Sequence, residues 1–429
     1  MHPTSRPNAW KWWLTVVLFL GTVLTYLDRQ TLSLCAPAIT ADMHLSGEQY
    51  GRLLAAFRWT YALTHVVAGF VADRLSLRGV YAVAVLVWSL AGASAAFTLR
   101  FPQLLLTRQV LGIGEAFNWP CATRIVADML PPQDRALASG IFNSGSAIGS
   151  LVAPFMILPI AQIYGWRAAF VVIGGLGIVW VALWLMVTRR KNALTASVES
   201  LDESRVMHAT RPNWRVATML ASCRDILLHP AFWMLAIVGL CVNPCWYFLN
   251  DWVPKYMHDQ RGMSQLSAGM TSVPVFLFGG LGNLAGGALV KYLTFLGWPL
   301  RRARGLTVVL AVLLVLPVGG VASVQNATLV VVVLSSAAFG LTAVLANYTA
   351  CQQDLSFANV GAVVGFLGLA CNVFSATANP WIGSYVDRTG SYHVIFVLLG
   401  ALPLLALVAT LVFDWLILGR GALNPDTAA

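Results

Sequence analysis

The sequence holds 429 residues, of which 58% are hydrophobic and only 10% are charged, and its mean hydropathy is +0.73. This composition excludes water-soluble enzymes and disordered regulators, because both classes carry far fewer apolar residues. Continuous apolar runs of about 20 residues, such as 80–99 and 168–187, are long enough to cross a bilayer as α-helices. A transmembrane β-barrel would instead show alternating segments of about ten residues. We therefore expect an all-α integral membrane protein.

Twelve helical spans are predicted along the chain, separated by short polar breaks. The N-terminal segment lacks a small-residue cleavage site after a short apolar core, so we interpret it as the first retained helix and not as a signal peptide. The predicted spans cover residues 12–39, 49–73, 80–99, 103–130, 136–160, 167–187, 229–254, 267–292, 306–323, 328–350, 360–386 and 392–418.

The net charge of +10 results from an uneven distribution of Lys and Arg. Sixteen of these residues fall in segments on one side of the predicted spans, whereas only Arg100, Lys255, Arg261 and Arg388 fall on the other. Because positively charged loops remain in the cytoplasm, this asymmetry predicts that both termini are cytoplasmic. The charge therefore indicates membrane topology, and no nucleic-acid partner is expected.

A long polar stretch divides the chain into an N-terminal six-helix bundle (1–187), a cytoplasmic linker (188–228) and a C-terminal six-helix bundle with a short tail (229–429). Three segments of the first half have weak counterparts in the second. The segment at Gly69 recurs at Gly286, the segment at Asp28 recurs at Asn250, and residues 140–154 recur at 365–380. The offsets, about 217, 222 and 226 residues, agree closely and predict a duplicated six-helix unit.

The segment Gly69-Phe-Val-Ala-Asp73-Arg74-Leu-Ser-Leu-Arg78 resembles the loop signature of the major facilitator superfamily. Further segments resemble its anion:cation symporter branch, and most of all its bacterial hexuronate and aldonate carriers. They are Tyr26-Leu-Asp28-Arg29, Gly112-Ile-Gly114-Glu115-Ala-Phe-Asn118-Trp119-Pro120, residues 140–149, Gly165-Trp166-Arg167-Ala-Ala-Phe170 and Trp252-Val-Pro254-Lys255-Tyr256. The resemblance covers nearly the whole chain. It implies two pseudo-symmetric six-helix bundles and proton-coupled import of a sugar acid, such as a hexuronate, aldonate or aldarate, by alternating access.

Ionisable residues inside a bilayer cost several kcal/mol, so each of them is a functional candidate. The rise of a helix places Asp28 and Arg29, Arg58 and Glu115 in one layer near the membrane midplane. Arg29 and Arg58 offer guanidinium groups that suit a carboxylate, which favours an organic anion as substrate. The alternative is that Arg29 merely neutralises Asp28 or Glu115. In the resembled family, the arginine at the position of Arg29 contacts the substrate carboxylate.

Two carboxylates of this layer, Asp28 and Glu115, are candidate proton carriers, and the resemblance implies the same role. They could instead be static ion-pair partners. Arg108, two helical turns before Glu115, either holds this carboxylate or serves packing. Arg58 departs from the family pattern; it either recognises a second acidic or polar group of the substrate or lies against Glu115.

Neutral polar side chains complete the predicted cavity. Tyr61 matches a substrate-contacting tyrosine of the resembled family, and His65, on the same helix face, either shuttles protons or forms an interior hydrogen bond. Asn372 also matches a binding position of the family. Asp73, Arg74 and Arg78 are expected to form an ion-pair latch that gates the cytoplasmic side. Other candidate contacts to a hydroxylated substrate, which could equally serve helix packing, are Asn143, Ser146, Trp246, Tyr247 and Asn250.

Several classes of site are not expected. The seven cysteines lack metal-ligand spacing and are interpreted as small core residues, so neither a metal nor a cofactor is predicted. The segment Gly280-Leu-Gly282-Asn-Leu-Ala285 fits a dinucleotide-binding pattern but lies within a predicted span, where close helix packing explains it. We expect a monomeric carrier in contact with membrane lipid and not an enzyme. The alternatives are a carrier of an aromatic or dicarboxylic acid and a transporter-like membrane sensor.

Overall fold

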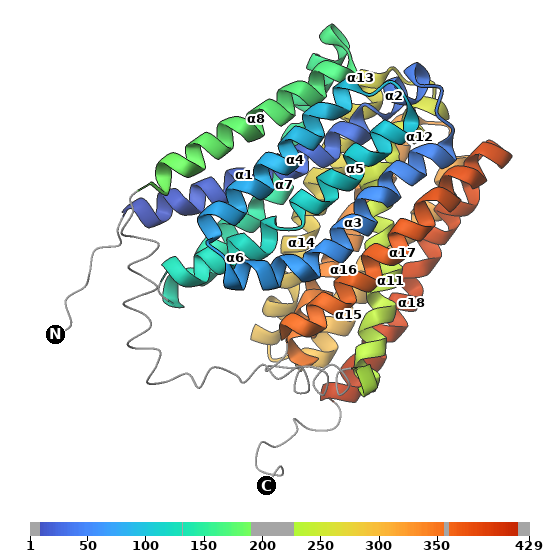
Figure 1. Ribbon diagram of the computed structural model, residues 1–429. Helices are drawn as coiled ribbons and strands as arrows, with labels where there is room; N and C mark the ends of the chain where they lie inside the picture. Colours follow the sequence, from blue (N-terminus) through green and yellow to red (C-terminus); the bar gives the residue numbers. More distant parts are fainter. Residues whose placement is uncertain (1–8, 131, 190–226, 356–359, 419–429) are drawn as a thin grey trace. The chain divides into compact units, whose positions relative to one another are not determined.

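The computed structural model describes residues 9–130, 132–189, 227–355 and 360–418, and all of its regular elements in these ranges are helices (Figure 1). Helices occupy the predicted ranges, although several ranges are divided between two elements. Most of the predicted linker (190–226) and the tail after Leu418 lie outside the described residues. The prediction of an all-helical chain is confirmed.

The described helices belong to two compact units, which we treat separately. The first unit comprises Met1–Leu45 and Arg52–Asn213, and the second comprises Ser46–Gly51 and Trp214–Ala429. The elements of the first half of the chain are α1 (Ala9–Leu34), α2 (Ala36–Asp42), α3 (Gly47–Arg74), α4 (Leu77–Ser94), η1 (Ala95–Phe97), α5 (Phe101–Glu115), α6 (Asn118–Met129), α7 (Pro132–Tyr164) and α8 (Trp166–Val187).

In the second half of the chain, the first described helix is α11, since residues 190–226 are not described. Its elements are α11 (Pro230–Asp251), α12 (Val253–Asp259), α13 (Gln265–Met270), α14 (Ser272–Phe295), α15 (Leu300–Val315), η2 (Leu316–Ser323), α16 (Ala327–Leu355), α17 (Val360–Thr389) and α18 (His393–Leu418). The first turn of α3 packs within this unit, since the backbone N–H groups of Gly47 and Glu48 donate to the Asp387 carboxylate at 2.7 and 2.8 Å. An acidic group is favourable at a helix N-terminus.

Within the described residues, nine helical segments are long and apolar enough to cross a membrane. Two of the remaining long helices, α1 and α3, carry charged residues within their length, namely Asp28 and Arg29 in α1 and Arg58 in α3. The α5–α6 region is divided into helices of 15 and 12 residues. These departures from a plain apolar span coincide with the residues that the sequence singled out as a site.

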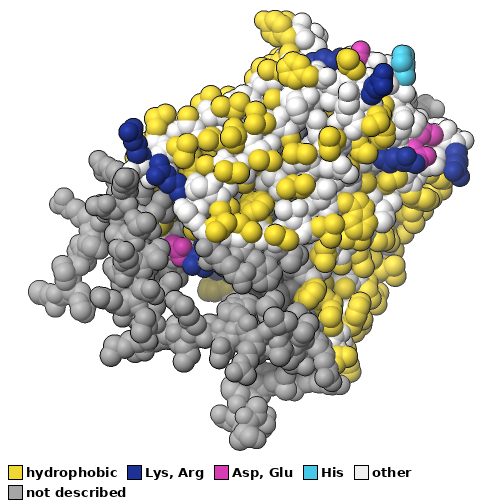
Figure 2. All heavy atoms as spheres, viewed as in Figure 1, with side chains coloured by type: hydrophobic (Ala, Val, Ile, Leu, Met, Phe, Trp, Pro, Cys, Tyr) yellow, Lys and Arg dark blue, Asp and Glu magenta, His cyan; other side chains and the backbone are white. Residues whose placement is uncertain are grey.

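Large apolar side chains face outward along the described helices. Val83 on α4 and Leu284 on α14, for example, are 61% and 71% exposed. Figure 2 shows hydrophobic side chains spread over the visible face, with Lys, Arg, Asp and Glu gathered toward the helix ends. An apolar surface of this extent is favourable in lipid and unfavourable in water.

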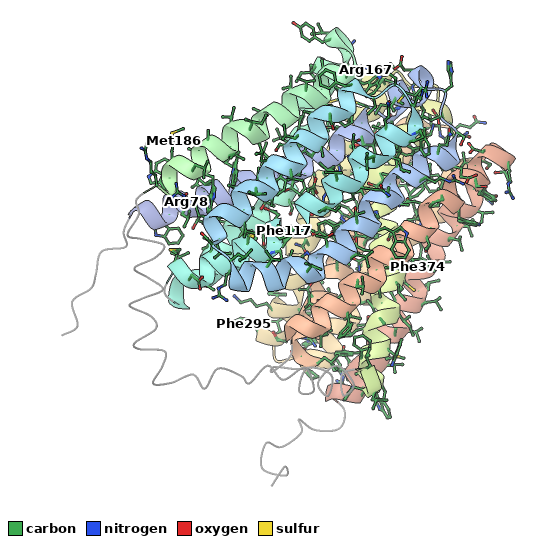
Figure 3. All side chains as sticks on the ribbon, in the orientation of Figure 1. Arg78, Phe117, Arg167, Met186, Phe295 and Phe374 are labelled. Atoms are coloured by element: carbon green, nitrogen blue, oxygen red, sulfur yellow. The ribbon has the colours of Figure 1, made fainter. Side chains whose placement is uncertain are left out.

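The C-terminal end of α2 and the N-terminal end of α8 are joined by the Gly165-Trp166-Arg167 segment. Gly165 adopts a φ of +83°, a conformation that favours glycine, and it lets α8 begin immediately afterwards. The Trp166 Nε1 and Arg167 Nη1 groups donate to Oδ2 of Asp42 at 3.3 and 2.6 Å. The hydrogen bond from Arg167 lowers the pKa of the Asp42 carboxyl below its usual value. In Figure 3, Arg167 and Met186 mark opposite ends of α8.

Close glycine contacts hold α14 against α16 in the second unit. A Cβ atom at Gly282 would overlap the backbone carbonyl oxygen of Phe339, and one at Gly286 would lie 2.6 Å from the carbonyl oxygen of Ala343. Helices in a membrane approach closely where small residues line the contact. This geometry confirms that helix packing, and not dinucleotide binding, explains the glycine pattern of residues 280–285.

We expect Gly282→Ala to lower the thermal stability of the purified protein, because the added methyl group forces α14 away from α16. The cost should be about 1–3 kcal/mol, typical of overpacking. Gly280→Ala on the same helix is the matched control, since nothing lies within 4 Å of a Cβ atom there. Thermal unfolding in detergent should show a lower midpoint for Gly282→Ala alone. Equal unfolding midpoints for both variants would contradict the close contact between α14 and α16 at Gly282.

All six cysteines within the described residues are free thiols with at most 7% exposure. They are Cys35, Cys121, Cys241, Cys245, Cys351 and Cys371. Free cysteine in an apolar interior behaves as a small hydrophobic side chain. The interpretation of these six residues as core positions is therefore confirmed.

Candidate functional site

The fourth predicted span (103–130) is not one continuous helix. It ends as α5 at Glu115 and resumes as α6 at Asn118, with Phe117 at the junction (Figure 3). Pro120 explains the break, because proline has no N–H to donate to the carbonyl of Ala116, four residues earlier. The expectation of an unbroken span at 103–130 was wrong, and the interruption lies directly beside Glu115.

Arg29 and Glu115 form an ion pair inside the first unit, with Nε of Arg29 2.6 Å from Oε2 of Glu115. The Glu115 side chain is fully buried, whereas that of Arg29 is 24% exposed. The other polar ends of the pair, Nη2 of Arg29 and Oε1 of Glu115, are buried and have no hydrogen-bond partner within the described part of the chain. Buried polar atoms are ordinarily hydrogen-bonded, so these two atoms offer unused binding capacity.

Three aromatic rings surround the Arg29 guanidinium group. Its central carbon lies 5.2 Å from the ring centre of Tyr26 and 4.9 Å from those of Phe57 and Tyr61. The Tyr61 ring also stacks on Phe57, with centres 5.7 Å apart. Cation–π contacts of this kind stabilise a guanidinium group where water is scarce and restrict its orientation. The aromatic enclosure therefore restricts the orientation of the Arg29 guanidinium group.

The second carboxylate, Asp28, lies beside this pair. It is 4% exposed and interacts electrostatically with Glu115, Arg108 and Arg29. Gly92 on α4 makes room for it, since a Cβ atom there would lie 2.9 Å from Oδ1 of Asp28. Asp28 therefore shares one buried electrostatic cluster with the ion pair.

Arg108 belongs to the same cluster. It is 3% exposed, lies 5.3 Å from the Phe57 ring centre and is a charge partner of Glu115. Arg108 thus combines an electrostatic interaction with Glu115 and packing against the Phe57 ring. Arg58 on α3 is also buried, but the charge partners of Glu115 are Arg29 and Arg108. When all four side chains are ionised, Arg29 and Arg108 balance the charges of Asp28 and Glu115.

The Major Facilitator Superfamily profile matches residues 18–378 of this sequence. The chain belongs to the major facilitator superfamily. It is a multi-pass membrane transporter and not an enzyme. The matched region includes every charged residue of the cluster described above.

Relatives of this superfamily member match along almost its whole length. A hexuronate transporter of Bacillus subtilis is 29% identical over 414 residues, which cover 94% of this chain and 95% of the relative. A probable galactarate/D-glucarate transporter of the same organism is 27% identical, covering 95% and 93% of the two chains. A probable sulfoacetate transporter of Cupriavidus necator is also 27% identical, covering 90% of each.

Solved structures of the superfamily share the fold. An inward-facing, unoccupied bacterial homologue of the human lysosomal transporter Spinster superposes with a TM-score of 0.73, 20% identity and 95% coverage of both chains. A D-xylose–proton symporter gives a TM-score of 0.70 at 13% identity and covers 92% of this chain and 96% of its own. At these identities the likeness establishes the fold.

Several of the neutral candidate residues form hydrogen bonds with the backbone of their own helix. The Ser146 hydroxyl donates to the carbonyl of Asn143 at 2.8 Å, and Asn143 itself is exposed on α7. In the second unit, the Asn250 amide donates to the carbonyl of Trp246 at 2.6 Å, and the Asn372 amide donates to that of Gly368 at 2.9 Å. A donor within a membrane helix satisfies itself locally in this way.

Trp246 and Tyr247 of α11 also belong to the second unit. The Trp246 ring packs against Gly279 and Phe276 of α14, and Tyr247 is half-buried. Substrate contacts by these residues, and by Asn143, Ser146, Asn250 and Asn372, remain predictions.

The predicted cytoplasmic latch is described only in part. The side chains of Asp73 and Arg74 lie outside the described residues. Nη2 of Arg78 donates to the carbonyl of Leu185 at 3.2 Å, and Arg78 and Met186 lie at the same end of the unit in Figure 3. Gating by these three residues remains a prediction.

Sequence reasoning missed the aromatic enclosure and the support beneath it. Tyr26 and Phe57 were not singled out, although they precede Arg29 and Tyr61 by three and four residues, a spacing that places them on the same helix faces. It also missed the chain of hydrogen bonds in which the Tyr81 hydroxyl donates to Asn118 at 2.6 Å and the Asn118 amide donates to Thr22 at 3.4 Å. Asn118 opens α6, so this chain anchors the helix break.

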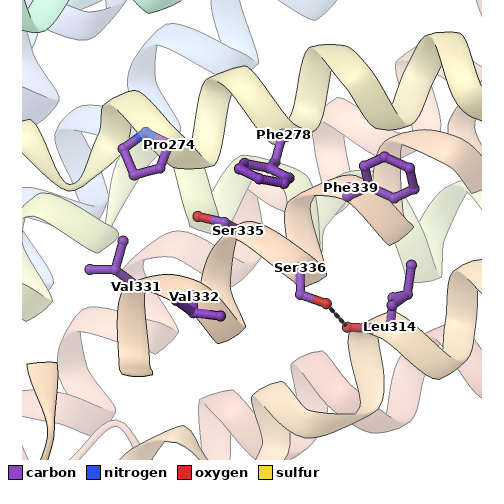
Figure 4. A pocket seen from close by; sticks show the side chains of 8 residues that line it. All are labelled: Pro274, Phe278, Leu314, Val331, Val332, Ser335, Ser336 and Phe339. Carbon is purple, nitrogen blue, oxygen red and sulfur yellow. Dashed lines mark hydrogen bonds between the residues drawn. The ribbon is translucent and has the colours of Figure 1, made fainter. Parts of the chain in front are cut away.

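A cavity in the second unit has a different character. Figure 4 shows apolar side chains around it, together with Ser335 and with Ser336, whose hydroxyl donates to the carbonyl of Leu314 at 3.0 Å. None of its lining residues is ionisable. A carboxylate would have no charged partner there, so the Arg29 cluster is the better candidate for an anion.

Proposed function

We propose that this chain is a proton-coupled carrier that imports a sugar acid, such as a hexuronate, aldonate or aldarate, by alternating access. The observation that carries the proposal is the Arg29–Glu115 pair, in which a rigidly enclosed guanidinium group retains one unused donor, Nη2. A carboxylate accepts two parallel hydrogen bonds from such a group.

The sugar part of the substrate is inferred from the relatives. Those named as transporters of hexuronate, galacturonate and galactarate/D-glucarate are 27–29% identical over most of the chain. The runner-up is a carrier of another acid, such as a dicarboxylic or aromatic one. The probable sulfoacetate transporter, at 27% identity, supports this alternative because its named substrate is a smaller anion without the sugar hydroxyls.

Proton coupling follows from competition for Arg29. Glu115 occupies the guanidinium group while no anion is bound, and an arriving carboxylate displaces it. A buried carboxylate without its cation is unfavourable, so the displaced Glu115 takes up a proton. Asp28 is the second acid of the cluster and carries a proton in the same scheme. Substrate and H⁺ then bind together and are released together.

The membrane arrangement belongs to the same proposal. Twelve spans with both termini in the cytoplasm agree with the distribution of Lys and Arg. The carrier is proposed to work as a monomer in the bacterial inner membrane. Arg58 and Tyr61 are proposed to contact the substrate. The same role is proposed for Trp246, Tyr247, Asn250 and Asn372, and gating of the cytoplasmic side is proposed for Asp73, Arg74 and Arg78.

Thermal unfolding of the purified protein with a ligand panel tests the function. A ligand that binds only the folded state, present at a concentration 100 times its Kd, stabilises that state by about 2.7 kcal/mol. We expect galacturonate, glucuronate, gluconate or galactarate to raise the unfolding midpoint, and glucose to leave it unchanged. Stabilisation by sulfoacetate alone would favour the runner-up. Stabilisation by glucose equal to that by the sugar acids would contradict anion recognition by Arg29.

A further inference from the structure

His65 is held by the carbonyl group that the α5–α6 break leaves free. Its Nδ1 atom lies 3.1 Å from the carbonyl oxygen of Ala116. Because Pro120 supplies no N–H to that carbonyl, the histidine replaces the missing helical donor. A carbonyl oxygen can only accept, so Nδ1 carries the hydrogen. In the neutral ring, Nε2 is then a hydrogen-bond acceptor with a free lone pair.

The imidazole ring lies next to the anion-binding group. It stacks on Tyr61 with ring centres 5.5 Å apart and an interplanar angle of 24°, and Tyr61 in turn contacts the Arg29 guanidinium group. His65 is half-buried, and no hydrogen-bond partner of its Nε2 occurs among the described residues. The two ring contacts place the imidazole within reach of a six-carbon acid whose carboxylate is bound at Arg29.

We propose that His65 determines specificity for a hydroxylated acid, with its Nε2 accepting a hydrogen bond from a substrate hydroxyl. The inference rests on the proposed function and identifies His65 as the residue that recognises the hydroxyl groups of the substrate. An acceptor nitrogen attracts an O–H group, whereas it gains nothing from a methylene group. A site that hydrogen-bonds a hydroxyl discriminates strongly against an analogue that lacks it, because the polar atom is then left unpaired.

Two substitutions separate this role from a merely structural one. The amide nitrogen of asparagine reaches about the position of Nδ1, so His65→Asn keeps the donor to Ala116 and removes the Nε2 acceptor. The longer His65→Gln places its amide near Nε2 and gives up the bond to Ala116. His65→Phe keeps the ring on Tyr61 and removes both nitrogens, which provides a second test should the asparagine variant fold poorly.

The readout is the affinity for galacturonate and for adipate, a six-carbon acid without hydroxyl groups, measured by calorimetry on the purified full chain. We expect His65→Asn and His65→Phe to bind galacturonate about tenfold more weakly or worse, with adipate affinity unchanged. His65→Gln should retain galacturonate affinity within about threefold. The galacturonate-to-adipate ratio, and not overall binding, is the quantity that should change.

Three results would overturn the inference. If His65→Asn binds galacturonate normally and His65→Gln binds it more weakly, then His65 acts only by supporting the helix break through its bond to Ala116. Equal losses of affinity for galacturonate and adipate would indicate a general structural defect. No loss of affinity in any variant would mean that another residue recognises the substrate hydroxyl. Failure of the parent protein to bind any sugar acid would overturn the proposed function as well, so the two failures are distinguishable.

Discussion

Replacing Arg29 with lysine is expected to weaken galacturonate binding about a hundredfold or more while leaving the protein folded. Lysine keeps the positive charge beside Glu115 but presents a single ammonium group, which cannot offer a carboxylate the two parallel hydrogen bonds of a guanidinium fork. The aromatic rings that enclose Arg29 would also lose their flat stacking partner. Calorimetric titration with galacturonate measures the effect.

The choice of control matters because removal of Arg29 has a second consequence. Arg29→Ala strands the fully buried Glu115 and should destabilise the fold by about 3–5 kcal/mol, which would obscure a binding defect. The double variant Arg29→Ala/Glu115→Gln removes both charges and avoids this loss. Arg388→Lys, on an exposed side chain near the end of α17, is the matched control and should bind normally. If Arg29→Lys and the double variant bind galacturonate with near-parental affinity, Arg29 does not bind the substrate carboxylate.

Neutralising either acid of the cluster is expected to abolish accumulation of substrate driven by a pH gradient. Glu115→Gln and Asp28→Asn cannot release a proton, so the unloaded carrier no longer returns in a deprotonated form. Counterflow exchange should survive in part, because exchange does not require an empty carrier to return. Uptake of labelled galacturonate by proteoliposomes, with pH gradient and exchange measured separately, distinguishes the two steps. Glu48→Gln, in the first turn of α3, serves as the carboxylate control.

Membrane potential provides an independent check on the same acids. If both carry protons, one net positive charge enters with each monoanion, and 100 mV changes the driving force by about 2.3 kcal/mol. An inside-negative potential should then accelerate uptake by the parent protein and not by either variant. Continued accumulation against a gradient in both variants, with parental pH dependence, would make Asp28 and Glu115 structural ion-pair partners.

The shared layer of the charged residues in the candidate site could be predicted from sequence, but the pairing between them could not. The rise per residue of a helix places Arg29 and Glu115 in one layer, and the cost of burying charge marks both as functional candidates. Rotation about each helix axis decides which acid Arg29 contacts, and that rotation depends on packing between helices far apart in sequence. Glycines such as Gly92, which admits Asp28 against α4, set this packing and carry no readable signal of their partner.

Polar residues in apolar helices form local bonds that the sequence does not show. Asn250 and Asn372 are predicted to contact the substrate, and each amide also donates to a carbonyl four residues earlier in its own helix. A side chain in lipid surroundings satisfies its hydrogen bonds with the nearest backbone group when it can. His65 differs because the break at Pro120 offers it the carbonyl of Ala116, in the junction between α5 and α6. Sequence could have located that break, since proline within a predicted span predicts a free carbonyl four residues earlier.

The burial of the cysteines makes this chain a convenient background for chemical labelling. A water-soluble maleimide reacts with exposed thiols, so the six described cysteines should remain unmodified while the protein is folded. Replacing Cys223, which lies outside the described residues, with serine would leave a chain whose reactivity comes from any newly introduced cysteine. A reporter at Asn143, which is exposed on α7, could then follow the opening of the protein to water during transport without a wholly cysteine-free variant.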